Sequence, residues 1–211
     1  MSAGGAPRGR RPLTFRRLVG LDRSGGPPPE TRRGEALHPW TLPNAIGFAR
    51  LALIPVFLVV ALQSDDGRDG FAFALFAFIA WTDYLDGMVA RVTGQYSRLG
   101  ALLDPLVDRL LVISGVAVCC HFDLLPHWAL AVLVARELLM LVLGRYSLSR
   151  GIELRINWPG RLAVAPVMGG LFFPMCGLPT LGEVLLYVGL ALALLATALY
   201  LRDGRRALHV T

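Results

Sequence analysis

The segment TDYLDGMVARVTGQYSRLGALLDPLVD, residues 82–108, places four aspartates between two apolar runs that are each long enough to cross a membrane. A charged aspartate at the centre of a membrane helix costs about 2.5–3.5 kcal/mol on insertion scales, and less near the membrane interface. Four such residues in one short segment therefore need a compensating partner or a function.

The composition of the whole chain is typical of an integral membrane protein. Of its 211 residues, 55% are hydrophobic and only 17% are charged, an apolar fraction too high for an ordinary soluble surface. The net charge is +6, and every basic residue is an arginine. Most of these arginines lie in the N-terminal region and between apolar segments, which indicates anionic lipid headgroups as neighbours and argues against a nucleic-acid partner.

The pattern of apolar segments divides the chain into three regions. Residues 1–40 are rich in Arg, Pro and Gly and are expected to form a disordered cytosolic tail. Residues 41–203 are expected to form an all-α membrane catalytic domain of six transmembrane helices, and residues 204–211 a short cytosolic C-terminus. The six helices are predicted from six stretches, each near the ~20 residues that span a bilayer: 43–62, 70–90, 100–120, 125–147, 161–177 and 181–201. The fifth stretch is the weakest, because it contains two prolines and a pair of glycines.

The distribution of arginine between these stretches predicts the orientation in the membrane. The N-terminal region, the 91–99 and 148–160 connections and the C-terminal RDGRR all carry arginine, whereas the other three connections contain only Arg68. By the positive-inside rule, both termini and the arginine-bearing connections face the cytosol. A bacterial cell membrane is the expected location.

The four aspartates are expected to meet at the cytosolic end of the bundle. Asp83 and Asp86 share one face near the end of the second predicted helix, and Asp104 and Asp108 share one face near the start of the third. A short connection makes these helices antiparallel neighbours, so the two faces can meet. Small residues on the same faces leave room for a ligand there: Gly87, Ala90 and Gly100.

Clustered carboxylates repel one another unless a cation binds between them. An all-oxygen set of ligands suits Mg²⁺ or Mn²⁺, and two such ions would form a clamp for phosphoryl chemistry. Two alternatives remain open. The aspartates could be helix caps or surface charges paired with Arg91, Arg98 and Arg109, or they could form the relay of a small ion or proton transporter.

The pattern Asp83-x-x-Asp86-Gly87-x-x-Ala90-Arg91-x8-Gly100-x-x-x-Asp104-x-x-x-Asp108 resembles the signature of the CDP-alcohol phosphatidyltransferases. The resemblance does not extend to the N-terminal tail. It implies a homodimeric six-helix membrane enzyme that transfers a phosphatidyl group from CDP-diacylglycerol to an alcohol and releases CMP. It also implies that Asp83, Asp86 and Asp104 are the main metal ligands, together with Asp108, the general base. Four further residues would line the CDP site: Gly87, Ala90, Arg91 and Gly100.

The alcohol acceptor is suggested by arginines further along the chain. Asp104-Pro105-x-x-Asp108-Arg109 and Ala135-Arg136-Glu137 look like the family branch that uses glycerol 3-phosphate or phosphatidylglycerol, although that branch usually has lysines where Arg109 and Arg161 stand. Three arginines are candidates for binding the acceptor phosphate: Arg136, Arg145 and Arg161. The preferred acceptor is glycerol 3-phosphate, which gives phosphatidylglycerol phosphate, and the alternative is phosphatidylglycerol, which gives cardiolipin. Arg136 could instead form a structural pair with Glu137.

Two polar residues at the head of the first predicted helix allow two interpretations. Asn44 and Arg50 could contact the nucleotide, or they could serve as a helix cap and an interface anchor.

Overall fold

The computed structural model describes residues 41–93, 97–149 and 158–208. This part of the chain contains six α-helices and no strand: α2 (Leu42–Gln63), α3 (Gly70–Thr93), α4 (Arg98–His121), α5 (His127–Ser149), α6 (Trp158–Met175) and α7 (Pro179–Leu208). The helices coincide with the six apolar stretches, so the predicted all-α six-helix fold is confirmed. The last helix continues to Leu208, past the predicted boundary at residue 203. The predicted disordered tail lies outside the described residues.

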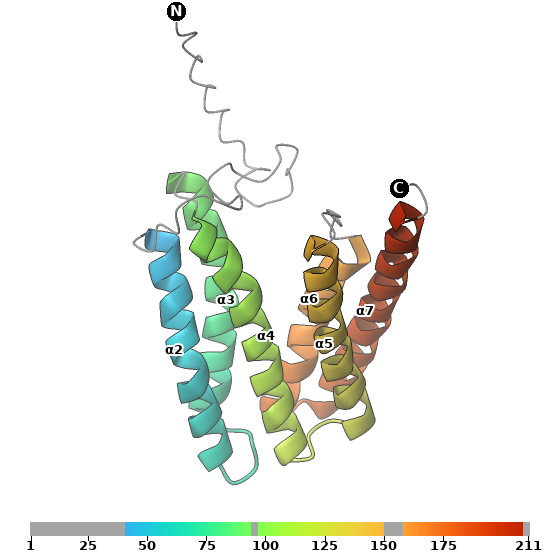
Figure 1. Cartoon of the computed structure of the whole chain (residues 1–211). Coiled ribbons are helices and arrows are strands. Elements are labelled where there is room, and N and C mark those ends of the chain that lie inside the picture. Colours follow the sequence, from blue (N-terminus) through green and yellow to red (C-terminus); the bar gives the residue numbers. More distant parts are fainter. Residues whose placement is uncertain (1–40, 94–96, 150–157, 209–211) are drawn as a thin grey trace, which may run out of the picture.

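The helices run alternately up and down in two groups of three, α2–α3–α4 and α5–α6–α7 (Figure 1). Within the first group α2 packs against both α3 and α4, and within the second α6 packs closely against α7. The starts of α2, α4 and α6 lie at the same end of the bundle as the ends of α3, α5 and α7 (Figure 1). We call this end, where the signature segment lies, the site end.

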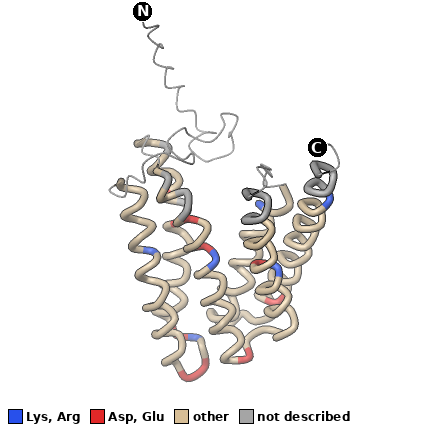
Figure 2. The backbone as a smooth tube through the Cα atoms, in the orientation of Figure 1, with Lys and Arg blue, Asp and Glu red and all other residues tan. Residues whose placement is uncertain are grey.

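Three of the described helices are both long and apolar enough to cross a membrane: Leu42–Gln63, Gly70–Ala90 and Pro179–Arg202. The other three carry charged residues within or beside their apolar runs: Asp104, Asp108 and Arg109 in α4, Arg136 and Glu137 in α5, and Arg161 in α6. The α2–α3 loop at the opposite end of the bundle is acidic (Figure 2). With three helices that can cross a membrane by length and composition, the chain is a multi-pass membrane protein.

The helix predicted with least support, α6, is continuous because it packs directly on α7. A Cβ atom added at Gly170 would lie 2.8 Å from the backbone nitrogen of Leu186, and one added at Gly189 would lie 2.7 Å from that of Val167. Small residues allow membrane helices to approach this closely. The glycines that weaken α6 as an isolated helix thus create the surface that holds it against its neighbour.

Aromatic side chains join the two groups of helices in the core. The ring of Phe57 in α2 lies 5.3 Å from the ring of Phe76 in α3, measured between centroids, and Phe76 lies 6.5 Å from Phe172 in α6. Phe57 and Phe76 are fully buried. This packing fixes α2 and α3 relative to α6 and so supports the polar cluster at the site end.

Candidate active site

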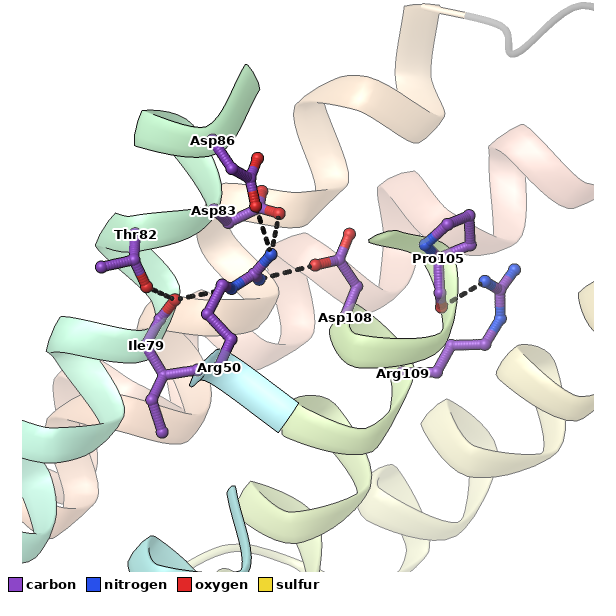
Figure 3. A network of polar contacts seen from close by, with 8 residues as sticks. All are labelled: Arg50, Ile79, Thr82, Asp83, Asp86, Pro105, Asp108 and Arg109. Atoms are coloured by element: carbon purple, nitrogen blue, oxygen red, sulfur yellow. Dashed lines mark hydrogen bonds and ion pairs between the residues drawn. The ribbon is translucent and has the colours of Figure 1, made fainter. Parts of the chain in front are cut away.

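Three of the four predicted carboxylates converge on one guanidinium group (Figure 3). Arg50 of α2 donates through Nη1 to Asp83 Oδ1 at 2.7 Å and to Asp86 Oδ2 at 3.0 Å, both on α3. Its Nη2 donates to Asp108 Oδ1 of α4 at 3.1 Å. The structure therefore confirms that the two faces meet, and it adds a cation from a third helix at their meeting point.

Arg50 is held in place by its surroundings as well as by these carboxylates. Its side chain is only 1% exposed, and its Nε donates to the backbone oxygen of Ile79 at 3.3 Å. The hydroxyl of Thr82 donates to the same oxygen at 2.9 Å. A buried charge is tolerated when it is paired and hydrogen-bonded, and Arg50 meets both conditions.

The carboxylates around Arg50 differ in their exposure. The Asp86 side chain is 8% exposed, whereas those of Asp83 and Asp108 are 43% and 45% exposed. Each of the three accepts from Arg50 through one oxygen only. The second oxygens of Asp83 and Asp108 can therefore meet a ligand that approaches from outside the cluster.

Asp104 lies one helical turn before Asp108 on α4, is exposed, and has no hydrogen-bond or ion-pair partner among the described residues. The cluster thus holds four negative charges against the single positive charge of Arg50. It has a strong residual attraction for cations.

A preformed metal site is absent from the described part of the chain, since no group of three or more His, Cys, Asp or Glu side chains there is arranged to hold a metal ion. The guanidinium group of Arg50 lies between Asp83, Asp86 and Asp108 and contacts all three. The donor set still suits a hard divalent cation, because three carboxylates keep one oxygen each away from Arg50 and Asp104 keeps both.

Gly100, predicted to line a nucleotide site, packs against Asn44 of α2. A Cβ atom at Gly100 would lie 2.7 Å from Asn44 Oδ1. Ser97, whose hydroxyl caps α4 by accepting from the Gly100 amide at 2.9 Å, donates to Asn44 Oδ1 at 2.8 Å. The glycine thus accommodates the Asn44 side chain, and this network fixes the start of α4, the helix that carries Asp104 and Asp108.

The other residues predicted to line the CDP site are only partly described. Gly87 and Ala90 lie on α3 beyond Asp86 and are half-buried, whereas nothing is described of the Arg91 side chain. Their role in binding CDP stays a prediction.

Of the three predicted acceptor arginines, the structure describes the side chains of Arg136 and Arg161. Arg136 of α5 forms an ion pair with the adjacent Glu137 and donates through Nε to Thr197 Oγ1 of α7 at 3.3 Å. Arg109 lies 3.9 Å from Glu137. This is the arrangement expected of the structural alternative for Arg136. Arg161 is exposed at the start of α6, and the Arg145 side chain lies outside the described residues.

Arg50 is the residue whose importance the sequence least revealed. It is the only charged residue of α2, and an ionisable residue in an apolar helix is by default a functional candidate. That signal was present in the sequence. Its partners were not, because they lie 33, 36 and 58 residues away.

Comparison with known proteins supports the resemblance seen in the signature segment. Residues 40–195 match the family described as CDP-alcohol phosphatidyltransferase. The chain is 36% identical over 157 residues to a cardiolipin synthase (CMP-forming) of Streptomyces coelicolor, covering 72% of this chain and 73% of the relative. It is 35% identical over 165 residues to a putative cardiolipin synthase of Mycobacterium tuberculosis, covering 76% and 78%. It is 32% identical over 142 residues to the CDP-diacylglycerol–glycerol-3-phosphate 3-phosphatidyltransferase of Bacillus subtilis, covering 62% and 69%.

Proposed function

Because the chain belongs to the CDP-alcohol phosphatidyltransferase family, we propose that it is a membrane phosphatidyltransferase of phospholipid synthesis that uses CDP-diacylglycerol and releases CMP. The observation that carries this proposal is the convergence of Asp83, Asp86 and Asp108 at one end of a membrane bundle, inside the region that matches the family. A proton relay across the membrane would instead need carboxylates at several depths.

In this reaction Asp108 is the general base. One of its oxygens is held by Arg50 and its side chain is 45% exposed, so its other oxygen can accept the proton of the acceptor hydroxyl. The freed oxygen attacks the phosphorus atom that carries diacylglycerol. The bond from that phosphorus to the oxygen of CMP breaks, and CMP leaves with the electron pair.

Mg²⁺ or Mn²⁺, with two ions expected, is assigned to four carboxylate ligands: Asp83, Asp86, Asp104 and Asp108. A divalent cation at this position would neutralise the charge that develops on the pyrophosphate as CMP departs. Asp83 and Asp108 contribute partly exposed carboxylates and Asp104 contributes one with no other partner. Because these three carboxylates are exposed or unpaired, a metal ion can reach the cluster from outside.

The CDP moiety is assigned to the site end beside α3 and the start of α4. The residues assigned to CDP are Gly87, Ala90, Arg91 and Gly100. The arginine-rich connections indicate that the site end faces the cytosol, together with both termini. A site at the membrane surface suits a substrate with a water-soluble head and two acyl chains. The homodimer is carried over from the family resemblance alone.

For the acceptor we favour phosphatidylglycerol, which gives cardiolipin. The two relatives of higher identity and coverage carry the name cardiolipin synthase. The charge of Arg136 is also already balanced by Glu137. A phosphate monoester carries about two negative charges at pH 7, whereas the phosphodiester of phosphatidylglycerol carries one and needs less compensation from arginine.

Glycerol 3-phosphate, the acceptor preferred from the sequence, becomes the second candidate and is supported by the Bacillus subtilis relative. Arg136, Arg145 and Arg161 are the residues assigned to its phosphate, and Arg161 is the exposed one among the described side chains. Both acceptors present a glycerol hydroxyl near a phosphate, so the same base and the same carboxylates serve either reaction.

The test is CMP release by the purified protein in detergent from CDP-diacylglycerol, with phosphatidylglycerol, glycerol 3-phosphate, inositol phosphate or serine as acceptor. Phosphatidylglycerol should support the fastest release, and chelation of divalent cations should abolish it. Faster release with glycerol 3-phosphate would reverse the order of the two acceptors. No release with any acceptor and either metal would refute the proposed function.

A further inference from the structure

Arg50 contacts the same carboxylates that the proposed reaction assigns to a metal ion. A buried guanidinium lies within 2.7–3.1 Å of three carboxylates to which we assign a metal. Either the metal displaces Arg50, or Arg50 and the metal share the same carboxylates.

The hydrogen-bond geometry favours sharing. Arg50 contacts Asp83 through Oδ1, Asp86 through Oδ2 and Asp108 through Oδ1, which is one oxygen of each carboxylate. Syn and anti lone pairs on the remaining oxygens stay available, and a carboxylate has about four acceptor sites in all. Asp104 does not contact Arg50 and is fully available.

The surroundings of Arg50 also oppose its displacement. The side chain is 1% exposed, and its Nε is bonded to the Ile79 carbonyl, which Thr82 also contacts. Moving the guanidinium out of the cluster would break four hydrogen bonds and leave a charged group in an apolar helix pair. Such a desolvated charge is costly without partners.

We propose that Arg50 is a positioning residue: its guanidinium is a resident cation that gathers Asp83, Asp86 and Asp108 before any metal binds, and it stays in place afterwards. Each carboxylate then presents its second oxygen to the metal in a fixed direction. The first part of this proposal concerns the metal-free protein alone, whereas the second part rests on the metal-dependent function proposed above.

The experiment compares the full chain with Arg50→Met, Arg50→Lys and a matched control, Arg68→Met, in detergent without substrate. Arg68 lies in the loop at the opposite end of the bundle, with a side chain that is 44% exposed. Thermal unfolding in EDTA measures the metal-free cluster. Titration with Mn²⁺, followed by the electron paramagnetic resonance signal of the free ion, measures metal affinity without reference to turnover.

Arg50→Met should lower the unfolding midpoint in EDTA, because three carboxylates lose their common cation, and added Mn²⁺ should restore part of the loss. Its Mn²⁺ affinity should fall about 10–100-fold, the range typical of residues that orient metal ligands. Arg50→Lys keeps the charge but lacks the planar fork, so its Mn²⁺ affinity should also fall. The control should match the wild type in both measurements.

Two results would overturn the proposal. Tighter or unchanged Mn²⁺ binding in Arg50→Lys or Arg50→Met would mean that the arginine competes with the metal or is irrelevant to it. An unchanged midpoint of Arg50→Met in EDTA would mean that the arginine does not hold the cluster together. If Arg50→Met does not fold, Arg50→Lys decides the affinity question. If the wild type itself binds no divalent cation, the metal assignment fails, and the EDTA comparison still tests the role of Arg50.

Discussion

Arg50 Nη1 and Asp83 Oδ1 lie 2.7 Å apart and join α2 to α3 across 33 residues of sequence. The same guanidinium reaches Asp108 of α4 through its other terminal nitrogen. Three helices therefore meet at one buried cation, and the position of Asp108, the proposed general base, depends on a residue that lies outside the signature segment.

Asp104 and Asp86 should respond differently to loss of charge, because only Asp86 contacts Arg50. Asp86→Ala removes the oxygen that accepts from Arg50 and should lower the free energy of unfolding of the metal-free protein by about 1.5–3 kcal/mol, the contribution of a hydrogen bond to a charged group. Asp104→Ala removes no hydrogen bond and relieves repulsion between carboxylates, so it should not lower this free energy, while it should weaken Mn²⁺ binding. Unfolding in EDTA and Mn²⁺ titration of both variants check this pair, and equal destabilisation would contradict the geometry.

Gly100→Ala should be destabilising because the new methyl group would meet Asn44 Oδ1. Overpacking of this kind costs about 1–3 kcal/mol. Gly47→Ala on α2 is the control, since a Cβ there meets nothing within 4 Å, and it should be neutral or slightly stabilising. In the Asn44→Ala background, which itself loses the hydrogen bond from Ser97, the additional cost of Gly100→Ala should largely disappear. An undiminished additional cost relative to Asn44→Ala alone would show that Asn44 is not the obstacle.

The adjacent glycines of α6 offer a test of the α6–α7 packing. At Gly170 an added Cβ would meet the backbone of Leu186 at 2.8 Å, whereas at Gly169 it would meet the mobile end of the Leu185 side chain at 3.1 Å. Gly170→Ala should therefore lower the thermal unfolding midpoint clearly more than Gly169→Ala, because a backbone cannot move aside as a side chain can. The opposite order would mean that α6 and α7 are farther apart than described.

Arg136 has a structural contact and an assigned role in acceptor binding, and the two can be separated. Arg136→Met and Thr197→Val each remove the hydrogen bond between α5 and α7, so both should lower the unfolding midpoint. Only Arg136→Met should raise the KM for the acceptor, and more than the KM for CDP-diacylglycerol. Steady-state kinetics with each substrate varied in turn give the answer. Equal changes in both KM values would remove Arg136 from the acceptor site.

The positions of the helices could be predicted from the sequence because hydropathy is a local property. Stretches of ~20 apolar residues must form helices in a membrane, where backbone groups find no other partners. The meeting of the Asp83–Asp86 and Asp108 faces was also predictable, because a short connection makes α3 and α4 antiparallel. The continuity of α6 was not as predictable, since it depends on the contact of Gly170 with α7.

The contacts that complete the site depend on how distant helices pack, which one sequence does not reveal. Arg50 could be recognised as unusual in an apolar helix, but its place among the carboxylates follows from the packing of α2 against α3 and α4. The role of Gly100 changed for the same reason. Its missing side chain predicted open space, and in the structure Asn44 fills that space.

The central claim is that the carboxylates around Arg50 catalyse phosphatidyl transfer with Asp108 as the base. Its most direct test is the rate of CMP release from CDP-diacylglycerol and phosphatidylglycerol by the wild type and by Asp108→Asn, with Mg²⁺ and at equal folded protein. The substitution removes a general base, which contributes about 10²–10⁴-fold, while its amide oxygen can still accept from Arg50. We predict that Asp108→Asn binds Mn²⁺ but releases CMP at least about 100-fold more slowly. A rate equal to that of the wild type would contradict the account.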